Sequence, residues 1–588
     1  MKSETTEKYI DRLLKQATEA IFRSSGQHLE ISAVSAISIP KPEFGDYSSN
    51  IAMVLAKQVK KNPKQLAEEI IAQLKPLDTQ RKFSDVKAVG GFINFTLAVD
   101  SLAENLRSII DQRDLYGCSV DGGDKTVVFE YSSPNTNKPL HIGHTRNDVY
   151  GAACINLLKA QGYKVVSCEI INDRGIHIMK SMLMYQKFGA GKTPESEKVK
   201  PDHFVGKFYQ MFAEQSSESP AKEKLLLDEA QALLLKWEAG DGEVRKLWQT
   251  MNNWWYAGVK QTYEKEGSYF DEVDYESDIY DKGRDLVLAG VKEGIFHKSP
   301  QDQSVYFAYD ENGKQDQKFL LRADGTTIYI TQDMYLWHYR NEKHHPNLAL
   351  VTTAGEQAYH FKVLKKIFEA QKYPWAENFK HLPYEHVFLG KDKMSSRGGN
   401  TITADDLVES VKARIKEVML NTERIKASAQ DDKLVESIAF GAIKYGYLKY
   451  EPNTRIYFNL DETISVEGNT GPYIQYAHAR ICSMLKNAGD LKQSVEAETF
   501  KPQEENLMRK LLHYGELVEF SAREYKPNIL CNYLFELAQT FNSFYQEVPV
   551  LKEQDEQLRS FRLNLITATA QVIKNGLYLL GIKAPEEM

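Results

Sequence analysis

One segment constrains the fold more than any other. The apolar run Thr126-Val-Val-Phe-Glu-Tyr131 is followed by a polar loop, an expected helix from about Gly143 to Ala160, and a second apolar run from Lys164 to Ile171. A strand, a helix and a strand in this order indicate a parallel sheet with a right-handed crossover. The sequence therefore predicts an α/β domain, and open sheets of this kind bind nucleotides at the carboxyl ends of their strands.

The loop between the first strand and the helix carries the first motif, Ser132-Ser-Pro-Asn-Thr-Asn-Lys-Pro-Leu-His-Ile-Gly-His-Thr-Arg146. His141 and His144 are three residues apart, so on one helical turn both can point the same way. Gly143 permits close approach of a ligand, and Lys138 adds a positive charge. Fixed donors of this kind stabilise charge that develops on a phosphoryl group under attack, and amides at a helix start also favour phosphate. A capped helix with two surface histidines is the simpler interpretation of an isolated His-x-x-His pair.

A second motif, Lys391-Asp-Lys-Met-Ser-Ser-Arg-Gly-Gly-Asn-Thr401, is a basic loop rich in glycine. It offers two ammonium groups, a guanidinium, two hydroxyls and flexible backbone amides. Such a loop can close on a triphosphate and on a departing pyrophosphate. Alone it is more simply a solvated loop, and its pairing with the first motif favours the phosphate interpretation.

The first motif resembles the HIGH signature of class I aminoacyl-tRNA synthetases, and the second resembles their KMSKS loop. The Ser-Ser-Pro-Asn sequence and the lysine before HIGH resemble the arginyl family. The resemblance implies activation of L-arginine by ATP with Mg²⁺ and transfer to tRNA(Arg), with bound tRNA needed for activation. The implied catalytic residues are Lys138, His141, His144, Lys391 and Lys393. The implied ATP contacts are His141, Gly143, His144, Met394, Ser395 and Ser396.

The second motif departs from the family consensus at Ser396, where the consensus has a second lysine. One cation is therefore missing from this loop. Arginyl enzymes with the same departure carry a lysine just before the HIGH signature, and Lys138 stands at that position. We expect Lys138 to supply the missing charge.

Arginine specificity requires carboxylates, because a guanidinium is planar, always charged and best held by bidentate pairs. Glu130 ends the strand before the first motif, and Tyr329 and Asp333 would share a face if a helix begins near them. By resemblance, the arginine contacts are Glu130, Asn135, Tyr329, Asp333 and Gln357. A salt bridge or a helix cap would explain each of these residues taken alone.

The chain of 588 residues is too long for one core, so three to four domains are expected. Residues 1–115 form an expected α+β domain that resembles the tRNA-contacting additional domain of the family. Residues 120–455 form the expected Rossmann-like α/β catalytic domain with a parallel sheet, interrupted by a mostly helical insertion around 190–265. Residues 456–588 form an expected all-α bundle. Within these domains, helices are predicted at 51–60 and 102–113, and strands at 90–97, 327–330 and 348–352.

The segments Glu467–Arg480 and Leu534–Tyr545 resemble helices of the family's anticodon-binding bundle. Tyr473, Tyr476 and Arg480 are the expected RNA contacts, because proteins read unstacked bases by aromatic stacking and edge hydrogen bonds. Packing within the bundle explains the tyrosines equally well.

Composition argues partly against a nucleic-acid partner. The net charge is −7, whereas an excess of Lys and Arg is the usual mark of RNA binding, so local patches would have to bind the RNA. Five scattered cysteines without a Cys-x-x-Cys pair argue against disulfides and structural zinc, and no protein metal site is expected. No apolar run spans a membrane and no signal region is found, so a cytoplasmic protein without a membrane partner is expected. The resemblance suggests a monomer.

Two other functions stay open at this stage. A small-molecule adenylating ligase could share the HIGH loop, but such enzymes lack an anticodon-binding bundle. A catalytically silent RNA-binding relative could lose the histidines, Lys138 or the second motif, all of which are present.

Overall fold

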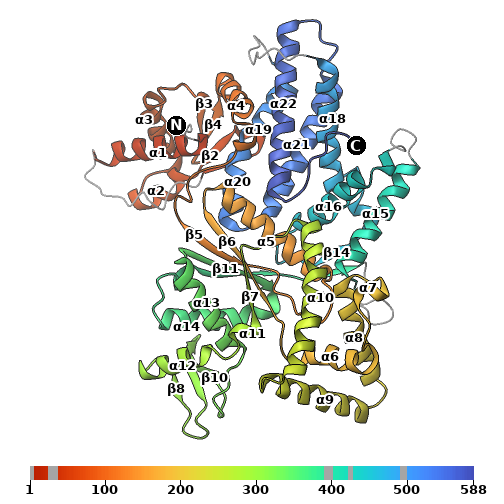
Figure 1. The fold of residues 1–588 in the computed structure, drawn as a ribbon. Helices are drawn as coiled ribbons and strands as arrows, with labels where there is room; N and C mark the ends of the chain where they lie inside the picture. Colours follow the sequence, from red (N-terminus) through yellow and green to blue (C-terminus); the bar gives the residue numbers. More distant parts are fainter. Residues whose placement is uncertain (1–4, 24–36, 390–401, 422–427, 490–499) are drawn as a thin grey trace.

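A five-stranded parallel sheet forms the centre of the protein (Figure 1). The computed structural model describes residues 5–23, 37–389, 402–421, 428–489 and 500–588. Every neighbouring pair of strands in the central sheet is parallel, which confirms the predicted α/β fold. The strand order is β12 (Phe379–Tyr384), β11 (Leu348–Ala354), β5 (Thr126–Glu130), β6 (Lys164–Ile171) and β7 (Glu272–Tyr275).

Successive side chains of β5 enter two different cores. Val127 and Phe129 pack in the core that includes α5 (Ile142–Ala160) and the C-terminal helices. Val128 packs in the core that includes α13 (Tyr329–His344) and α14 (Ala358–Ala370). Because both faces of a parallel sheet are covered at its centre, β5, β6 and β11 read as nearly continuous apolar runs, and this is why the sequence predicted these three strands. The two edge strands, β7 and β12, contain more polar residues and were not predicted.

One strand prediction is wrong. Thr327 forms only an isolated bridge with Leu321, and α13 begins two residues later at Tyr329. β-branched residues favour strands, but Ile328 is extended only as the N-cap of the helix, so tertiary context overrides the propensity. The C-terminal region also contains one short strand, β14 (Ile456–Phe458), which pairs in parallel with β13 (Val387–Leu389).

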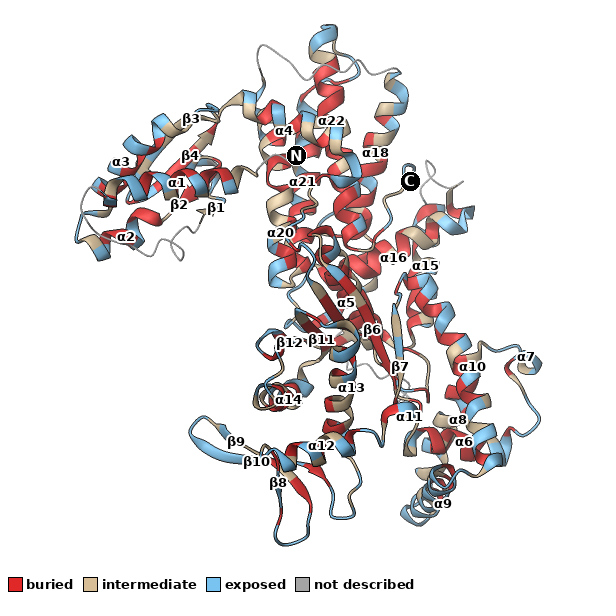
Figure 2. Ribbon diagram, turned by 60° about the vertical axis from the view of Figure 1, so that its left-hand side comes forward, coloured by how far each residue is buried: buried red, intermediate tan, exposed pale blue. Residues whose placement is uncertain are grey.

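The N-terminal unit has an antiparallel sheet and helices, as predicted for an α+β domain (Figure 2). The strand order is β1 (Ile37–Ser38), β2 (Tyr47–Ser49), β4 (Phe92–Leu97) and β3 (Phe83–Val89). The helices are α1 (Thr6–Arg23), α2 (Ile51–Val59), α3 (Pro63–Leu74) and α4 (Val99–Gln112). The sequence revealed only one of these strands because the others are short or half exposed.

The segment between β6 and β7 is helical. It contains α6 (Ile176–Phe188), α7 (Pro194–Glu197), α8 (Pro201–Ser216), α9 (Pro220–Glu238) and α10 (Gly242–Glu266). After β7 come α11 (Glu276–Ile279), α12 (Gly283–Lys292) and an antiparallel sheet of β8 (His297–Lys298), β9 (Val305–Glu311) and β10 (Lys314–Leu321). Figure 1 shows these two groups on opposite sides below the central sheet.

The C-terminal part is a bundle of long helices stacked over α5 (Figure 1). The helices of this part are α15 (Ala404–Leu420), α16 (Asp432–Leu448), α17 (Leu460–Thr463), α18 (Gly471–Ala488), α19 (Pro502–Leu512), α20 (Tyr514–Glu524), α21 (Pro527–Glu547) and α22 (Glu556–Leu579). Of these, α17 is a single turn, and α15 and α16 precede the bundle predicted from 456. Tyr150 of α5 donates a hydrogen bond to the carbonyl of Tyr525 at 3.0 Å, which joins the bundle to the central sheet.

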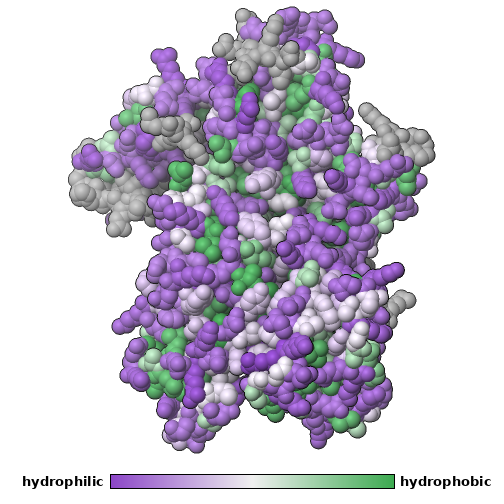
Figure 3. Space-filling model, viewed as in Figure 1, coloured by the Kyte–Doolittle hydropathy of each residue, from purple (hydrophilic) through white to green (hydrophobic). Residues whose placement is uncertain are grey.

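The surface seen in Figure 3 is mostly hydrophilic, and its hydrophobic residues form small separate groups. Within the described residues, no helix has both the length and the apolar character needed to cross a membrane.

Carboxylates meet where α1 contacts α20. Tyr47 donates to Glu516 Oε1 at 2.7 Å, and the backbone amide of Glu7 donates to the same oxygen at 3.1 Å. Burial, together with the charges of Glu516 and Glu519, raises the pKa of the Glu7 carboxyl to about 7. The folded protein therefore keeps a proton on Glu7 that the unfolded chain releases near its ordinary pKa.

Stability should fall as the pH rises from about 4.5 to 7, because Glu7 must then ionise beside two other carboxylates. Replacing Glu7 with glutamine should remove this slope and stabilise the protein at pH 8 by about 1 kcal/mol, a value reduced for partial exposure. Chemical denaturation at pH 5 and pH 8 measures the effect. Glu19→Gln on the same helix is the control, and an equal pH slope in Glu7→Gln and wild type would contradict the account.

Candidate active site

The first motif leaves β5 through a strained turn. Ser132 and Ser133 have φ values of 67° and 56°, a left-handed conformation that residues with a Cβ rarely adopt. The Ser132 hydroxyl shares a hydrogen bond of 2.8 Å with the Tyr263 hydroxyl, and a bridge between Asn135 and Asn172 holds the next part of the loop. Strain of this kind is concentrated at ligand sites, where the surrounding structure maintains it.

His141 and His144 are brought together at the start of α5. His141 is the N-cap, and its Nδ1 accepts from the Gly143 amide at 3.1 Å. His144 Nδ1 accepts from the His141 amide at 3.1 Å, so the two side chains form a reciprocal cap. Their rings stack with centroids 3.8 Å apart. The predicted pairing of the two histidines is present, and the capping that fixes it was not foreseen.

Both rings are neutral at physiological pH. Burial, with a contribution from Lys138, lowers the pKa of His141 to about 4, and burial lowers the pKa of His144 well below its usual range. Because each Nδ1 accepts a hydrogen bond, the proton of each ring is on Nε2. The site therefore presents two neighbouring neutral N–H donors.

Lys138 lies beside this pair, since its charge contributes to the lowered pKa of both histidines. Burial lowers the pKa of Lys138 itself. Among the described residues, none accepts a hydrogen bond from its ammonium group. The amides of Ile142 and Gly143 already donate to Ile402 O and to His141, so the side chains rather than these amides are available to a phosphate.

Glu130 is buried and paired with Arg340 of α13. The Arg340 guanidinium is fully buried, contacts Glu130 Oε2, and donates to Asp274 Oδ2 at 2.8 and 3.0 Å. Burial raises the pKa of Glu130, and Arg340 opposes that rise. The salt bridge that the sequence left open as an alternative role for Glu130 is therefore present, with Arg340 as the cation.

Replacing Arg340 with methionine should destabilise the protein by about 3–5 kcal/mol, because Glu130 and Asp274 would lose their buried cation. The loss should be larger at pH 8 than at pH 5.5, since protonation relieves an unpaired carboxylate. Urea denaturation at the two pH values measures it. A loss below about 1 kcal/mol at pH 8 would contradict this role, and Arg322→Met on the exposed turn provides the control.

The other predicted arginine contacts lie near the starts of α13 and α14 and in the loop of the first motif. Tyr329 is the first residue of α13 and 77% exposed, and Asp333 lies one turn later on the same helix. Asp333 Oδ2 accepts from His360 Nε2 at 2.6 Å, and its charge also raises the pKa of Glu130. Gln357 is exposed at the N-cap of α14, and Asn135 is exposed in the first motif.

Sequence reasoning missed a further carboxylate, Glu276, in the residue after β7. It is buried, and burial together with Asp173 and Asp333 raises its pKa to about 7. Its position at the carboxyl end of a parallel strand was the available signal. Glu276 and Asp333 therefore place two further carboxyl groups at the same edge of the sheet as Glu130.

Of the predicted RNA contacts on α18, Tyr476 is 38% exposed. Tyr473 accepts from Asn542 Nδ2 at 2.8 Å and packs against Phe535. The Arg480 guanidinium lies 4.1 Å from the centre of the Tyr545 ring. Tyr473 and Arg480 therefore also serve helix packing. In the second motif, Lys391, Lys393, Met394, Ser395 and Ser396 lie outside the described residues.

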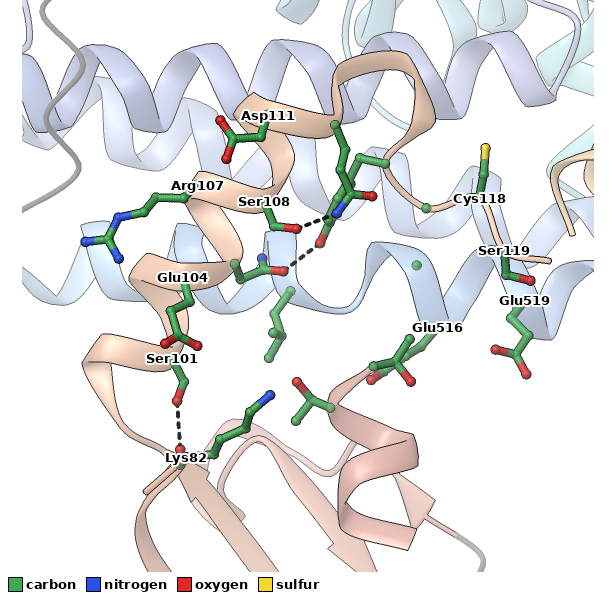
Figure 4. Close-up of a pocket in the computed structure, with 18 of the residues that line it drawn as sticks. Lys82, Ser101, Glu104, Arg107, Ser108, Asp111, Cys118, Ser119, Glu516 and Glu519 are labelled. Carbon is green, nitrogen blue, oxygen red and sulfur yellow. Dashed lines mark hydrogen bonds between the residues drawn. The ribbon is translucent and has the colours of Figure 1, made fainter. Parts of the chain in front are cut away.

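A separate cavity of about 410 Å³ lies between α4 and α20, at the junction of the N-terminal unit and the bundle (Figure 4). Its labelled carboxylates are Glu104, Asp111, Glu516 and Glu519, against the cations Lys82 and Arg107. This excess of negative charge does not suit a triphosphate, so the candidate site remains at the first motif.

Comparisons with known proteins agree with this geometry. The family model described as tRNA synthetases class I (R), catalytic domain, matches residues 105–460. The arginyl tRNA synthetase N terminal domain matches residues 8–97, and the DALR anticodon binding domain matches residues 474–588.

Relatives match over nearly the whole chain. An arginine–tRNA ligase of Treponema denticola is 39% identical over 93% of this chain and 94% of its own length. One of Parabacteroides distasonis is 36% identical with the same coverage. The solved arginyl-tRNA synthetase of Thermus thermophilus superposes with a TM-score of 0.85 and 25% identity, covering 99% of this chain and 100% of that one. The chain therefore belongs to the arginyl-tRNA synthetase family of class I synthetases.

Proposed function

We propose that this protein activates arginine with ATP and transfers it to tRNA(Arg) at the site formed by the first motif. The observation that carries the assignment is the stacked His141–His144 pair with both Nε2–H groups available beside Lys138. Two adjacent neutral donors and one cation suit an α-phosphate that gains negative charge during attack.

In the first step, an oxygen of the arginine carboxylate attacks the α-phosphorus of ATP. The bond from that phosphorus to the bridging oxygen breaks, and pyrophosphate leaves with the electron pair. His141 and His144 donate hydrogen bonds to the phosphoryl oxygens, and Lys138 balances the added charge. In the second step, a terminal ribose hydroxyl of the tRNA attacks the adenylate carbonyl, and AMP leaves. No protein nucleophile is required, and the rate enhancement comes from positioning and charge stabilisation.

Lys391, Lys393, Ser395 and Ser396 of the second motif would contact the departing pyrophosphate, with Met394 beside the nucleotide. Mg²⁺ enters with ATP as part of the substrate and neutralises phosphate charge. Glu130, Tyr329 and Asp333 would recognise the guanidinium. Asn135 and Gln357 would also contact arginine, and the exposure of both side chains leaves them accessible to a substrate.

The helical bundle from about 456 would bind the anticodon through Tyr476, with Tyr473 and Arg480 near it, and residues 1–115 would contact the outer corner of the tRNA. Activation would require bound tRNA. The protein would act as a monomer in the cytoplasm, as the family resemblance suggests.

The test is ATP–pyrophosphate exchange with each of the twenty amino acids, with and without tRNA. Exchange with arginine alone, and only when tRNA is present, is the expected result. Exchange with arginine in the absence of tRNA would support the proposed activation of arginine but show that activation does not depend on bound tRNA. Exchange with another amino acid would overturn the proposed substrate.

A further inference from the structure

The helical segment between β6 and β7 packs directly against the backbone of the first motif. Trp255 of α10 is fully buried, and its indole nitrogen donates to the carbonyl of Lys138 at 2.8 Å. Gly206 of α8 lies against Pro139 so closely that a Cβ there would come within 2.5 Å of Pro139 Cδ. The insertion therefore fixes the path of the chain on both sides of the Lys138 carbonyl.

The same helical segment also contacts Asp405, which lies in the first turn of α15. Lys200 Nζ donates to Asp405 Oδ2 at 2.7 Å and to Thr262 Oγ1 at 2.5 Å. His203 Nε2 lies 2.9 Å from Asp405 Oδ2. Lys200, His203 and Asp405 are all partly buried, with side-chain exposures of 19–27%. These contacts join α8 and α10 of the insertion to the start of α15.

Asp405 directly follows a short stretch that pairs with the first motif. The Ala404 amide donates to Leu140 O at 2.9 Å, and the Ile142 amide donates to Ile402 O at 3.3 Å. Between them, Thr403 and His141 form an antiparallel bridge. A change in the position of Asp405 would therefore move the backbone that lies against His141.

Asp202, His203 and Asp405 could by geometry hold a metal ion, since their ligand atoms lie within 4.8 Å of one another. The Lys200 ammonium, however, contacts both carboxylates, at 3.4 Å for Asp202 Oδ2 and 2.7 Å for Asp405 Oδ2. The cluster already contains its cation, and its chemistry is that of a structural clamp.

We propose that Lys200 and His203 are positioning residues that act through Asp405 on His141. The insertion clamps the 402–404 stretch onto the first motif and thereby keeps the His141–His144 pair in place. This inference rests on the proposed function, because its effect is exerted on the activation step. A misplacement of about 1 Å at a reacting centre can cost about 100-fold in rate.

The test measures arginine-dependent ATP–pyrophosphate exchange in the presence of tRNA for Lys200→Met, Asp405→Asn and the double variant. Each single variant should lower kcat by at least about tenfold, with KM for arginine within about twofold of wild type. The double variant should be no slower than the slower single variant, because both changes break one contact. Lys200→Arg keeps the cation and should recover part of the rate.

Lys207→Met is the matched control, because Lys207 is an exposed cation of α8 whose nearest carboxylate, on Glu197, lies 3.6 Å away. Thermal unfolding of each variant confirms that the assays are made on folded protein, and Asp405→Asn preserves the shape of the side chain. An unchanged kcat in Asp405→Asn, or rate losses that multiply in the double variant, would overturn the clamp. An inactive wild-type protein would instead count against the proposed function.

Discussion

Replacing Lys138 with alanine should lower kcat for arginine activation by about 100-fold and leave KM for arginine nearly unchanged. The reason is that Lys138 lies beside two neutral histidines in a partly buried site. There a cation stabilises negative charge on the phosphate more strongly than it would in water. The second motif has Ser396 where the family consensus has a lysine, so it offers one cation fewer. The rate of arginine activation is therefore expected to depend strongly on Lys138. Exchange kinetics with varied arginine separate the two constants.

A control for this variant is Lys187→Ala, which removes a surface cation of α6 that pairs with Glu229 at 2.5 Å. It should change neither constant. A Lys138→Ala enzyme with intact kcat and a raised KM for arginine would show that Lys138 binds substrate and does not stabilise the transition state.

Replacing Asp333 with asparagine should raise KM for arginine by about 10- to 100-fold, since a hydrogen bond to a charged group contributes about 1.5–3 kcal/mol. Asparagine preserves the shape of the side chain, so the expected change is in the negative charge that, in the proposed function, faces the arginine guanidinium. KM for ATP should stay within about twofold. Steady-state exchange with each substrate varied in turn measures both constants.

Asp324→Asn removes a carboxylate from the exposed turn before α13 and is the matched control. His360→Gln removes the imidazole that hydrogen-bonds to Asp333. It should raise KM for arginine less than Asp333→Asn does, because the Asp333 carboxylate stays charged. An unchanged KM for arginine in Asp333→Asn would remove Asp333 from the arginine pocket.

The three inner strands of the central sheet were predictable because they are buried on both faces and read as apolar runs, as Val127 to Phe129 do. The edge strands β7 and β12 mix polar and apolar residues, so the sequence did not reveal them. The strand expected at 327–330 was wrong because Ile330, Met334 and Trp337, at helical spacing, pack in the same core as Val128. This tertiary packing favours a helix from Tyr329 over the strand that local propensity suggests. The short strands of the N-terminal sheet carry little periodicity, so their pairing is decided by contacts distant in sequence.

The candidate site was predictable to the level of residue types. The spacing of His141 and His144 indicated that both would lie on one helical turn, but their tautomers depend on hydrogen bonds from backbone amides, which spacing alone does not reveal. Arg340 is buried against Glu130 and Asp274, which lie 210 and 66 positions away from it in the sequence. Glu276 and the clamp on Asp405 likewise arise only when separate elements meet.

The most direct test of the account is esterification of purified tRNA(Arg) with labelled arginine by the wild-type protein in the presence of ATP and Mg²⁺. The account predicts arginyl-tRNA, with one AMP and one pyrophosphate formed for each arginine attached. Binding of tRNA without ester formation, under conditions where ATP and arginine are saturating, would contradict it and indicate an RNA-binding protein that does not catalyse the reaction.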